Sequence, residues 1–496
     1  MNINKLKFKG FSILATVAFL VAIVLINVFT SMLTERFFLK ADLTDTGLYT
    51  ISERAMTFLS GVDEVVDVIV LSEESAWQAS STFSLVLNTL QNYSAATGGR
   101  LRVQYVNPDL NTFDGPTYNN SLSDLREAHT ELENMRRNDI IFLTSRRATA
   151  IPAAGLFTHA QDQFGRHVLA GVRTDQELVS ALTYVLNEKI ARVSFIDNHQ
   201  ENSTEFLNAV FERSGYISST INLAFEDIPE DTIILISSAP KFDFLDEEIQ
   251  KIEQFLALGG NVILLYDFGT QSLPNLDRFI EQWGMIVENK IIFDDDYMIP
   301  QLGIIGVHVV SGPLSSTEAA EGITKNQIPV GAFRPRPVRS IWAEGSMGGV
   351  TLVPLVQTFS SSSFAKDLSA GITTQERESG DESGPFVIAY NARHLTRDAD
   401  NKQVYANLIV SGATLFDDPF LGMYSSTFYN ALLIADIAND LNPFGESVFI
   451  QAKPLSDNHM LVSLAGARNI LIFMVIAMPL AILAIGIFVW RKRRHK

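Results

Sequence analysis

Two long segments without a charged residue, 11–33 and 470–490, constrain this chain more than any other feature. At about 1.5 Å rise per residue, each is long enough as a helix to cross a hydrocarbon core of ~30 Å. Basic residues lie on the outer side of both segments, in the tails 1–10 and 491–496. By the positive-inside rule, we expect both tails in the cytoplasm and the body between them across the membrane. A cleavable signal peptide is the alternative for the first segment, although no clear A-x-A cleavage site follows it.

The charge of the body limits the partners that it can bind. Eight of the 38 Lys and Arg residues lie in the two tails, which leaves 30 against 56 Asp and Glu in 11–490. So acidic a body disfavours nucleic acid, whose phosphates are neutralised by Lys and Arg, and an anionic membrane surface. The chain has no cysteine, which excludes disulfides, thiol catalysis and Cys-ligated zinc or iron–sulfur clusters.

The body alternates apolar strands with amphipathic helices. The predicted strands are 65–71, 101–106, 139–144, 192–196, 217–223, 232–237, 261–266 and 405–411. The predicted helices are 83–97, 174–186, 205–213, 245–258 and 428–441, with a further helix starting near Ser52. Long apolar strands between amphipathic helices predict an α/β fold with a doubly wound, largely parallel sheet that is covered on both faces.

The same pattern predicts how the body is divided. A smaller α/β domain with a βαβ unit is expected over 44–165, and the main α/β domain over 174–300. The signal weakens over 301–404, which we expect to be an irregular insertion. Residues 405–455 then return to the main domain, where the strand 405–411 and the helix 428–441 could complete the parallel sheet.

Several stretches of the body, taken in order, are similar to one family. They are 42–52 (DLTDTGLYTIS), 177–201 (ELVSALTYVLNEKIARVSFIDNHQE), 231–268, 276–294 and 407–441. Together with a Pro-containing final apolar segment and a basic tail, they resemble the GldG-like proteins, auxiliary components of ABC-type transporters associated with gliding motility. Members of that family often carry Gly-His-Gly-Glu in the loop that here reads Asn198-His199-Gln200-Glu201. A role that needs backbone close to a ligand is less expected without these glycines.

The resemblance implies a non-catalytic auxiliary subunit that binds cargo or partner proteins outside the membrane. Its expected partners are an ABC ATPase and a permease, and its expected location is the bacterial cytoplasmic membrane with the body in the periplasm. No cofactor is expected. Two alternatives stay open: a membrane-anchored enzyme of the cell envelope, acting on glycans or acyl groups, and a structural envelope protein. The chain lacks G-x-x-x-x-G-K-[ST], so we do not expect it to be the transporter's ATPase.

Polar residues at two predicted strand ends form the candidate ligand or partner crevice. Asn198, His199 and Glu201 follow the strand 192–196, and Asp267 ends the strand 261–266. Open α/β sheets bind ligands at the carboxyl ends of their strands. The alternative interpretation is a capped helix start with a solvated histidine. No catalytic residue is predicted.

Two acidic runs have simpler interpretations. Asp294, Asp295 and Asp296 could bind a hard cation, but adjacent carboxylates usually form a solvated turn, so no metal site is predicted. Asp417 and Asp418 precede Pro419 and are typical of a turn.

Overall fold

The computed structural model describes residues 48, 50–110, 121–161, 166–299, 303–309, 330–342, 346–359, 362–415, 430–444, 448–450 and 452–455. The predicted apolar segments 11–33 and 470–490 lie outside these residues, as do both basic tails. Among the described helices, none combines the length and the apolar character needed to cross a membrane.

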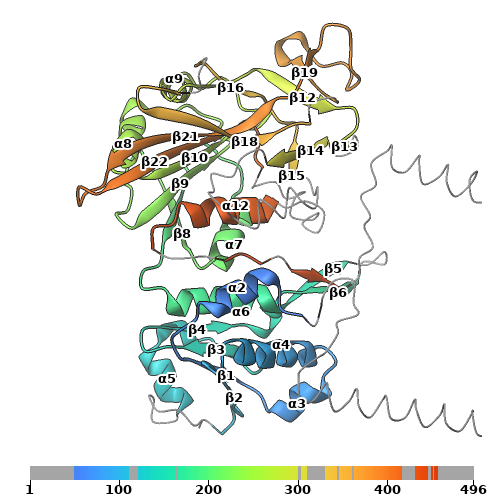
Figure 1. The fold of residues 1–496 in the computed structure, drawn as a ribbon, viewed down its shortest axis with the longest axis vertical. Coiled ribbons are helices and arrows are strands. Elements are labelled where there is room, and N and C mark those ends of the chain that lie inside the picture. The colour runs from blue at the N-terminus through green and yellow to red at the C-terminus, as the bar shows by residue number, and fades with distance from the viewer. Residues whose placement is uncertain are drawn as a thin grey trace, which may run out of the picture. The chain divides into compact units, whose positions relative to one another are not determined.

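The amino-terminal part of the body is a four-stranded sheet built on the predicted βαβ unit (Figure 1). Strand β1 (Val66–Val70) pairs in parallel with β2 (Leu101–Tyr105), and helices α3 (Glu74–Ala79) and α4 (Phe83–Ala96) lie between them in the chain. Strands β3 (Ile140–Leu143) and β4 (Ala148–Ile151) extend the sheet in antiparallel fashion. The βαβ prediction is confirmed.

Five parallel strands form one half of the main sheet. They are β7 (Arg192–Ile196), β8 (Ile217–Ile221), β9 (Thr232–Ser238), β10 (Asn261–Leu265) and β22 (Gln403–Ser411), in the order β8-β7-β9-β10-β22. Each neighbouring pair is parallel. The prediction that 405–411 rejoins this sheet is confirmed, because β22 lies directly beside β10.

The other half of the main sheet is antiparallel, which corrects two predictions. Strands β21 (Val387–Arg397), β18 (Val350–Gln357), β14 (Ile304–Val309) and β13 (Met298–Ile299) follow β22 in the sheet order. The sheet is therefore mixed, and the described parts of 301–404 are not an irregular insertion. Strand β18 was not predicted because it contains Pro354, and proline is rare in strand interiors. The sheet accommodates it by register shifts between Pro354 and Gln357.

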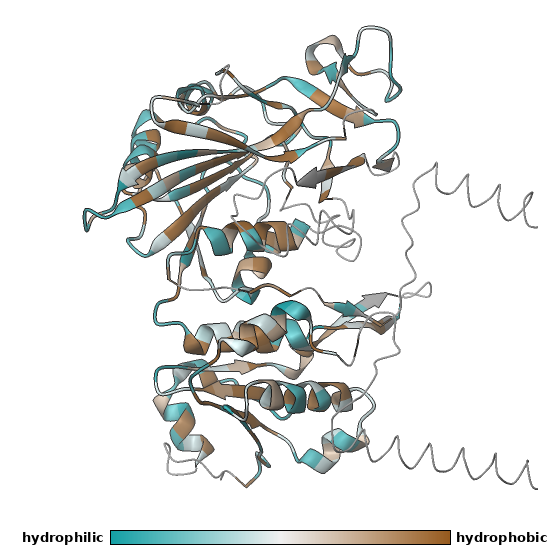
Figure 2. Ribbon diagram, viewed as in Figure 1, coloured by the Kyte–Doolittle hydropathy of each residue, from teal (hydrophilic) through white to brown (hydrophobic). Residues whose placement is uncertain are grey.

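Helices cover both faces of the main sheet. Alternate strand residues point to opposite faces, so Ile236 and Ile263 join a core with α7 (Glu205–Arg213) and α12 (Asn430–Asp440). On the other face, Leu235 and Val262 join a core with α8 (Asp246–Ala257) and α9 (Pro274–Gln282). The hydropathy colouring shows the apolar run along these strands (Figure 2).

The remaining described elements are shorter and lie around these sheets. The helices are α2 (Glu53–Ser60), α5 (Leu122–Ala128), α6 (Thr174–Leu186) and the 3-10 turns Thr130–Leu132, Ala153–Leu156 and Leu368–Ala370. The strands are β5 (Phe157–Gln161), β6 (His167–Val172), β11 (Met285–Val287), β12 (Lys290–Asp294), β15 (Val330–Phe333), β16 (Val338–Ser340), β17 (Ser346–Met347), β19 (Ser363–Asp367), β20 (Glu382–Ser383) and β23 (Lys453–Pro454).

Partly buried ion pairs tie the first and last described segments of the body to its helices. Both guanidinium nitrogens of Arg54 donate to Asp436, at 2.9 and 3.0 Å. The carboxylate of Asp175 accepts from the backbone nitrogen of Ser52 at 3.2 Å and pairs with Lys453 at 2.7 Å. Arg54, Asp175, Asp436 and Lys453 are called the end cluster below.

Candidate functional site at the carboxyl ends of the parallel strands

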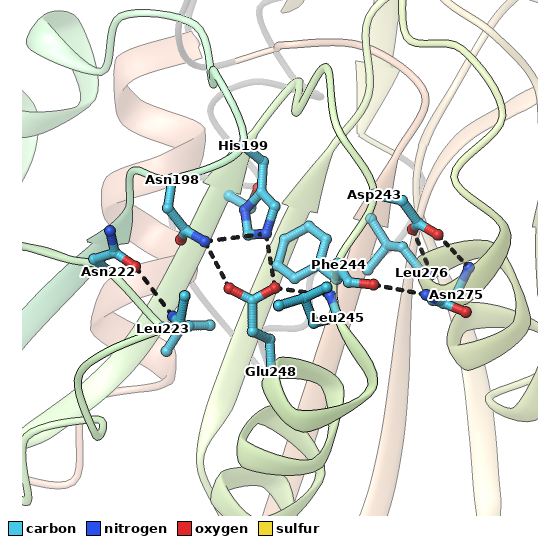
Figure 3. A network of polar contacts seen from close by, with 12 residues as sticks. Asn198, His199, Asn222, Leu223, Asp243, Phe244, Leu245, Glu248, Asn275 and Leu276 are labelled. Carbon is cyan, nitrogen blue, oxygen red and sulfur yellow. Dashed lines mark hydrogen bonds and ion pairs between the residues drawn. The ribbon is translucent and has the colours of Figure 1, made fainter.

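The candidate residues follow two strands of the parallel half. Asn198, His199 and Glu201 lie in the loop after β7, and Asp267 follows β10. Strand β9 lies between β7 and β10, so both loops are at one edge of the sheet. The structure brings Asn198 and His199 into one network with Glu248 of α8 (Figure 3), and Glu201 joins this network through His199.

His199 is buried between two carboxylates. Its Nδ1 lies 3.1 Å from Oε1 of Glu201, and its Nε2 lies 3.0 Å from Oε2 of Glu248. The residue is 3% exposed, and its ring stacks on Phe244 with the centroids 3.8 Å apart. The interpretation of His199 as a solvated histidine is therefore wrong. His199, Glu201 and Glu248 are called the histidine cluster below.

The geometry favours a doubly protonated imidazole. An ionised carboxylate can only accept a hydrogen bond, so each ring nitrogen donates when it carries a proton. Burial lowers the pKa of His199, but the hydrogen bonds and negative charges of Glu201 and Glu248 outweigh it and raise the pKa above its usual value. Burial raises the pKa of Glu248, and the bonds from Leu245, His199 and Asn198 more than offset this, so it is lowered. The charges of His199 and Glu248 thus stabilise each other.

Glu248 also stabilises the first turn of helix α8. It is the third residue of the helix, and its Oε2 accepts from the backbone nitrogen of Leu245 at 2.8 Å. A glutamate at this position commonly reaches back to the residue that precedes a helix. Its Oε1 accepts from Nδ2 of Asn198 at 2.6 Å. Sequence reasoning missed this residue, and the only available signal was an acidic side chain in the first turn of a predicted helix.

The backbone of the same loops is fixed by further hydrogen bonds. The carbonyl oxygen of His199 accepts from the backbone nitrogens of Lys241 and Phe242, at 2.8 and 3.1 Å. Gln200 and Ala239 have φ angles of +54° and +49°, in the left-handed region that favours glycine.

Asp267 lies outside the histidine cluster and has its own partners. Its Oδ2 pairs with Nζ of Lys241 at 2.7 Å, and its Oδ1 accepts from the hydroxyl of Thr270 at 2.8 Å. Burial raises the pKa of Asp267, but the bonds from Lys241 and Thr270, with the charge of Lys241, outweigh it and lower the pKa. The link to the other candidates is Asn202, whose Nδ2 donates to Oδ2 of Asp267 at 3.4 Å. A ligand-binding role for these four residues stays a prediction.

Asp295 and Asp296 of the first acidic run lie exposed in a turn, as the simpler interpretation predicts, but Asp294 ends β12 and is buried. Oδ1 of Asp294 accepts from the backbone nitrogens of Asp296 and Tyr297, both at 2.9 Å, and Asp295 pairs with Arg377 at 3.3 Å. Among the described residues, no group of three or more His, Asp or Glu side chains is arranged to hold a metal ion. Asp417 and Asp418 lie outside the described residues.

Comparisons with known proteins add little to this geometry. No protein-family model matches the chain, and no curated protein matches it. The mmIFT52 N-terminal domain is 14% identical with a TM-score of 0.35, over 52% of this chain and all of that domain. A ThuA-like protein from Bacteroides uniformis is 12% identical with a TM-score of 0.31, over 53% of this chain and 96% of its own. PurLQS from Thermotoga maritima is 10% identical with a TM-score of 0.27, over 51% of this chain and all of that one. TM-scores this low support no inference about function.

Proposed function

We propose that this protein is a non-catalytic auxiliary subunit of an ABC-type transporter, anchored in the bacterial cytoplasmic membrane by 11–33 and 470–490. Its acidic, doubly wound α/β body then lies outside the cytoplasm and binds cargo or partner proteins there. The resemblance to GldG-like proteins, the two apolar segments and their basic outer flanks support this proposal. Helices on both faces of the parallel strands agree with the doubly wound class.

The histidine cluster is the observation that most favours binding over catalysis. A general base needs a ring nitrogen within reach of the proton that it removes from the substrate. Both ring nitrogens of His199 face carboxylates of the protein itself, and the ring is buried against Phe244. We therefore assign the cluster to holding the strand-end loops in place, so that they present a fixed surface.

Co-purification tests the proposal directly. The full chain should be recovered with an ABC ATPase and a permease, from membranes solubilised in mild detergent. Reporter fusions at Thr112 and after Lys496 should report opposite sides of the membrane. Equal reporter activity at both positions would contradict the topology, and failure to recover either ABC subunit would contradict the transporter role. Turnover of a substrate by the purified chain would replace the proposal with the enzyme alternative.

A further inference from the structure

Three large apolar side chains are exposed beside the histidine cluster. Phe225 follows β8 and is 87% exposed, while Phe242 and Leu245 follow β9 and are 57% and 56% exposed. Single exposed apolar side chains are ordinary, but several in adjacent loops mark a contact surface. Phe225, Phe242 and Leu245 are called the apolar rim below.

The loops that carry the apolar rim lie together. Strands β8 and β9 both pair with β7, so their carboxyl ends are two strand spacings apart, about 10 Å. Lys251 of α8 joins the loop after β8 to this helix, because its Nζ donates to the carbonyl oxygens of Leu223 and Glu226, at 2.9 and 2.6 Å. Leu245 is the residue immediately before α8. The three side chains therefore belong to one surface.

The backbone beneath the apolar rim is fixed. The nitrogen of Phe242 donates to the carbonyl oxygen of His199, and Leu245 donates to Glu248 of the histidine cluster. Phe244 directly precedes Leu245, and Leu223 lies two residues before Phe225; both are fully buried. In Figure 3, Leu223 and Leu245 lie on either side of Glu248. A surface whose loops are already ordered loses less entropy when a partner binds.

Exposed carboxylates lie in the loops after β7 and β8 and in the first turn of α8, next to the apolar rim in the chain. They are Asp197, Glu226, Asp227, Asp246 and Glu247. The two lysines nearby are already paired, Lys241 with Asp267 and Lys251 with Asp227. A partner that covers the apolar side chains must therefore approach through negative potential, which favours Lys and Arg around its own apolar residues.

We propose that the apolar rim docks a protein segment in which apolar side chains are flanked by lysine or arginine, and that the transporter's permease supplies it. The identity of the partner rests on the proposed function, whereas its chemistry rests on the rim and its carboxylates. A second copy of this chain would bring the same negative charges, and an anionic membrane would be repelled. Charge complementarity thus selects a basic protein segment over either.

The test compares two double variants of the full chain. Phe225→Ser with Phe242→Ser removes the two largest rim side chains. Met347→Ser with Leu395→Ser is the control and removes two other exposed apolar side chains, 65% and 47% exposed, from β17 and β21. Recovery of the permease should fall at least tenfold for the rim variant and less than twofold for the control, with unchanged thermal unfolding. Recovery by the wild type should also weaken as salt is raised from about 50 to 300 mM, because exposed charges are screened.

A photo-crosslinking residue at position 242 identifies the occupant. The crosslinked permease peptide should contain apolar residues flanked by Lys or Arg. Recovery of the permease by the rim variant at wild-type level would overturn the docking surface and leave the proposed function standing. No recovery by the wild type would overturn both. An acidic crosslinked peptide, equal loss in the control variant, or vesicle binding that depends on Phe225 and Phe242 would also overturn it.

Discussion

Two groups of paired charged residues hold this body together, and they join residues at different separations along the chain. In the histidine cluster, His199 and Glu248 are 49 residues apart and belong to one half of one sheet. In the end cluster, Arg54 and Asp436 are 382 residues apart. The first fixes two loops beside the apolar rim, whereas the second joins the described ends of the body. Ion pairs thus hold neighbouring loops in place in the histidine cluster, and they join residues from the two described ends of the body in the end cluster.

The two clusters also differ in how much water reaches their charges. The side chains of Glu201 and Glu248 are 2% and 1% exposed. The side chains of Arg54 and Asp436 are 24% and 10% exposed. A charge left without its partner costs more free energy when water cannot solvate it. Loss of the cation should therefore destabilise the histidine cluster more than the end cluster.

Replacing the histidine should have the largest effect. His199→Leu leaves the carboxylates of Glu201 and Glu248 buried without a cation, and should lower the free energy of unfolding by about 3–5 kcal/mol. His199→Gln keeps a donor for one carboxylate and should cost about 1–3 kcal/mol. Urea unfolding of the three proteins measures the difference. Adding Glu248→Gln to His199→Leu should restore part of the loss, and full additivity of the two changes would contradict the cluster.

Breaking the end cluster should have a smaller effect. Burial raises the pKa of Asp436 in spite of Arg54, so in Arg54→Ala this carboxyl can take up a proton, which limits the loss. We expect a decrease of about 2 kcal/mol in the free energy of unfolding. Arg192→Ala is the control, because the Arg192–Asp231 pair is 25% and 52% exposed and should contribute less than about 0.5 kcal/mol. Equal losses in the two variants would show that burial of the Arg54 pair is unimportant.

The pH dependence of stability separates the histidine cluster from the rest of the body. The folded-state pKa of His199 is raised above 6.5, so its contribution is complete below that pH and is lost as pH rises through the folded pKa. The pKa of Glu248 is lowered below 4.5, so its contribution is lost only as pH falls through its folded pKa. The difference in free energy of unfolding between wild type and His199→Gln should therefore be larger near pH 5.5 than near pH 8.5. A difference that grows toward pH 8.5 would contradict the raised pKa.

Placing glycine at position 200 should have the smallest effect and the opposite sign. Gln200 occupies a left-handed conformation, which costs a residue with a Cβ about 1–2 kcal/mol. Gln200→Gly relieves this cost but adds freedom to the unfolded chain, so we expect a net gain of about 0.5 kcal/mol. Gln254→Gly, inside α8, should instead destabilise by about 1 kcal/mol. Thermal unfolding compares the two, and destabilisation by Gln200→Gly would show that the side chain has another role.

Local patterns predicted several elements of the body. The helices 174–186 and 205–213 and the strand 192–196 have the bounds that apolar spacing predicted. Ser52 accepts from the backbone nitrogen of Ala55 and begins α2, as its position suggested. These elements were predictable because burial on both sheet faces requires unbroken apolar strands, and helix ends require particular side chains.

The antiparallel half was not predictable in the same way. Its described strands include Pro354 and exposed residues, and they lie between segments with little apolar periodicity. The candidate site was predicted in part: Asn198, His199 and Glu201 do come together, but Asp267 pairs elsewhere and Glu248 was missed. The sequence does not show that the start of α8 faces the loop after β7, so Glu248 could not be predicted as a partner of His199.

The sequence by itself determined the order along the chain of the strands and helices of the parallel half. It also determined the charge and apolar character of each segment. These features depend on the local spacing of apolar and polar side chains, because that spacing decides which residues share one face of a helix or strand. Only the tertiary structure decided that His199 is buried, and that the antiparallel strands extend the main sheet. It also decided that Arg54 meets Asp436. Such contacts join residues far apart in the chain, so their partners are chosen by packing rather than by local pattern.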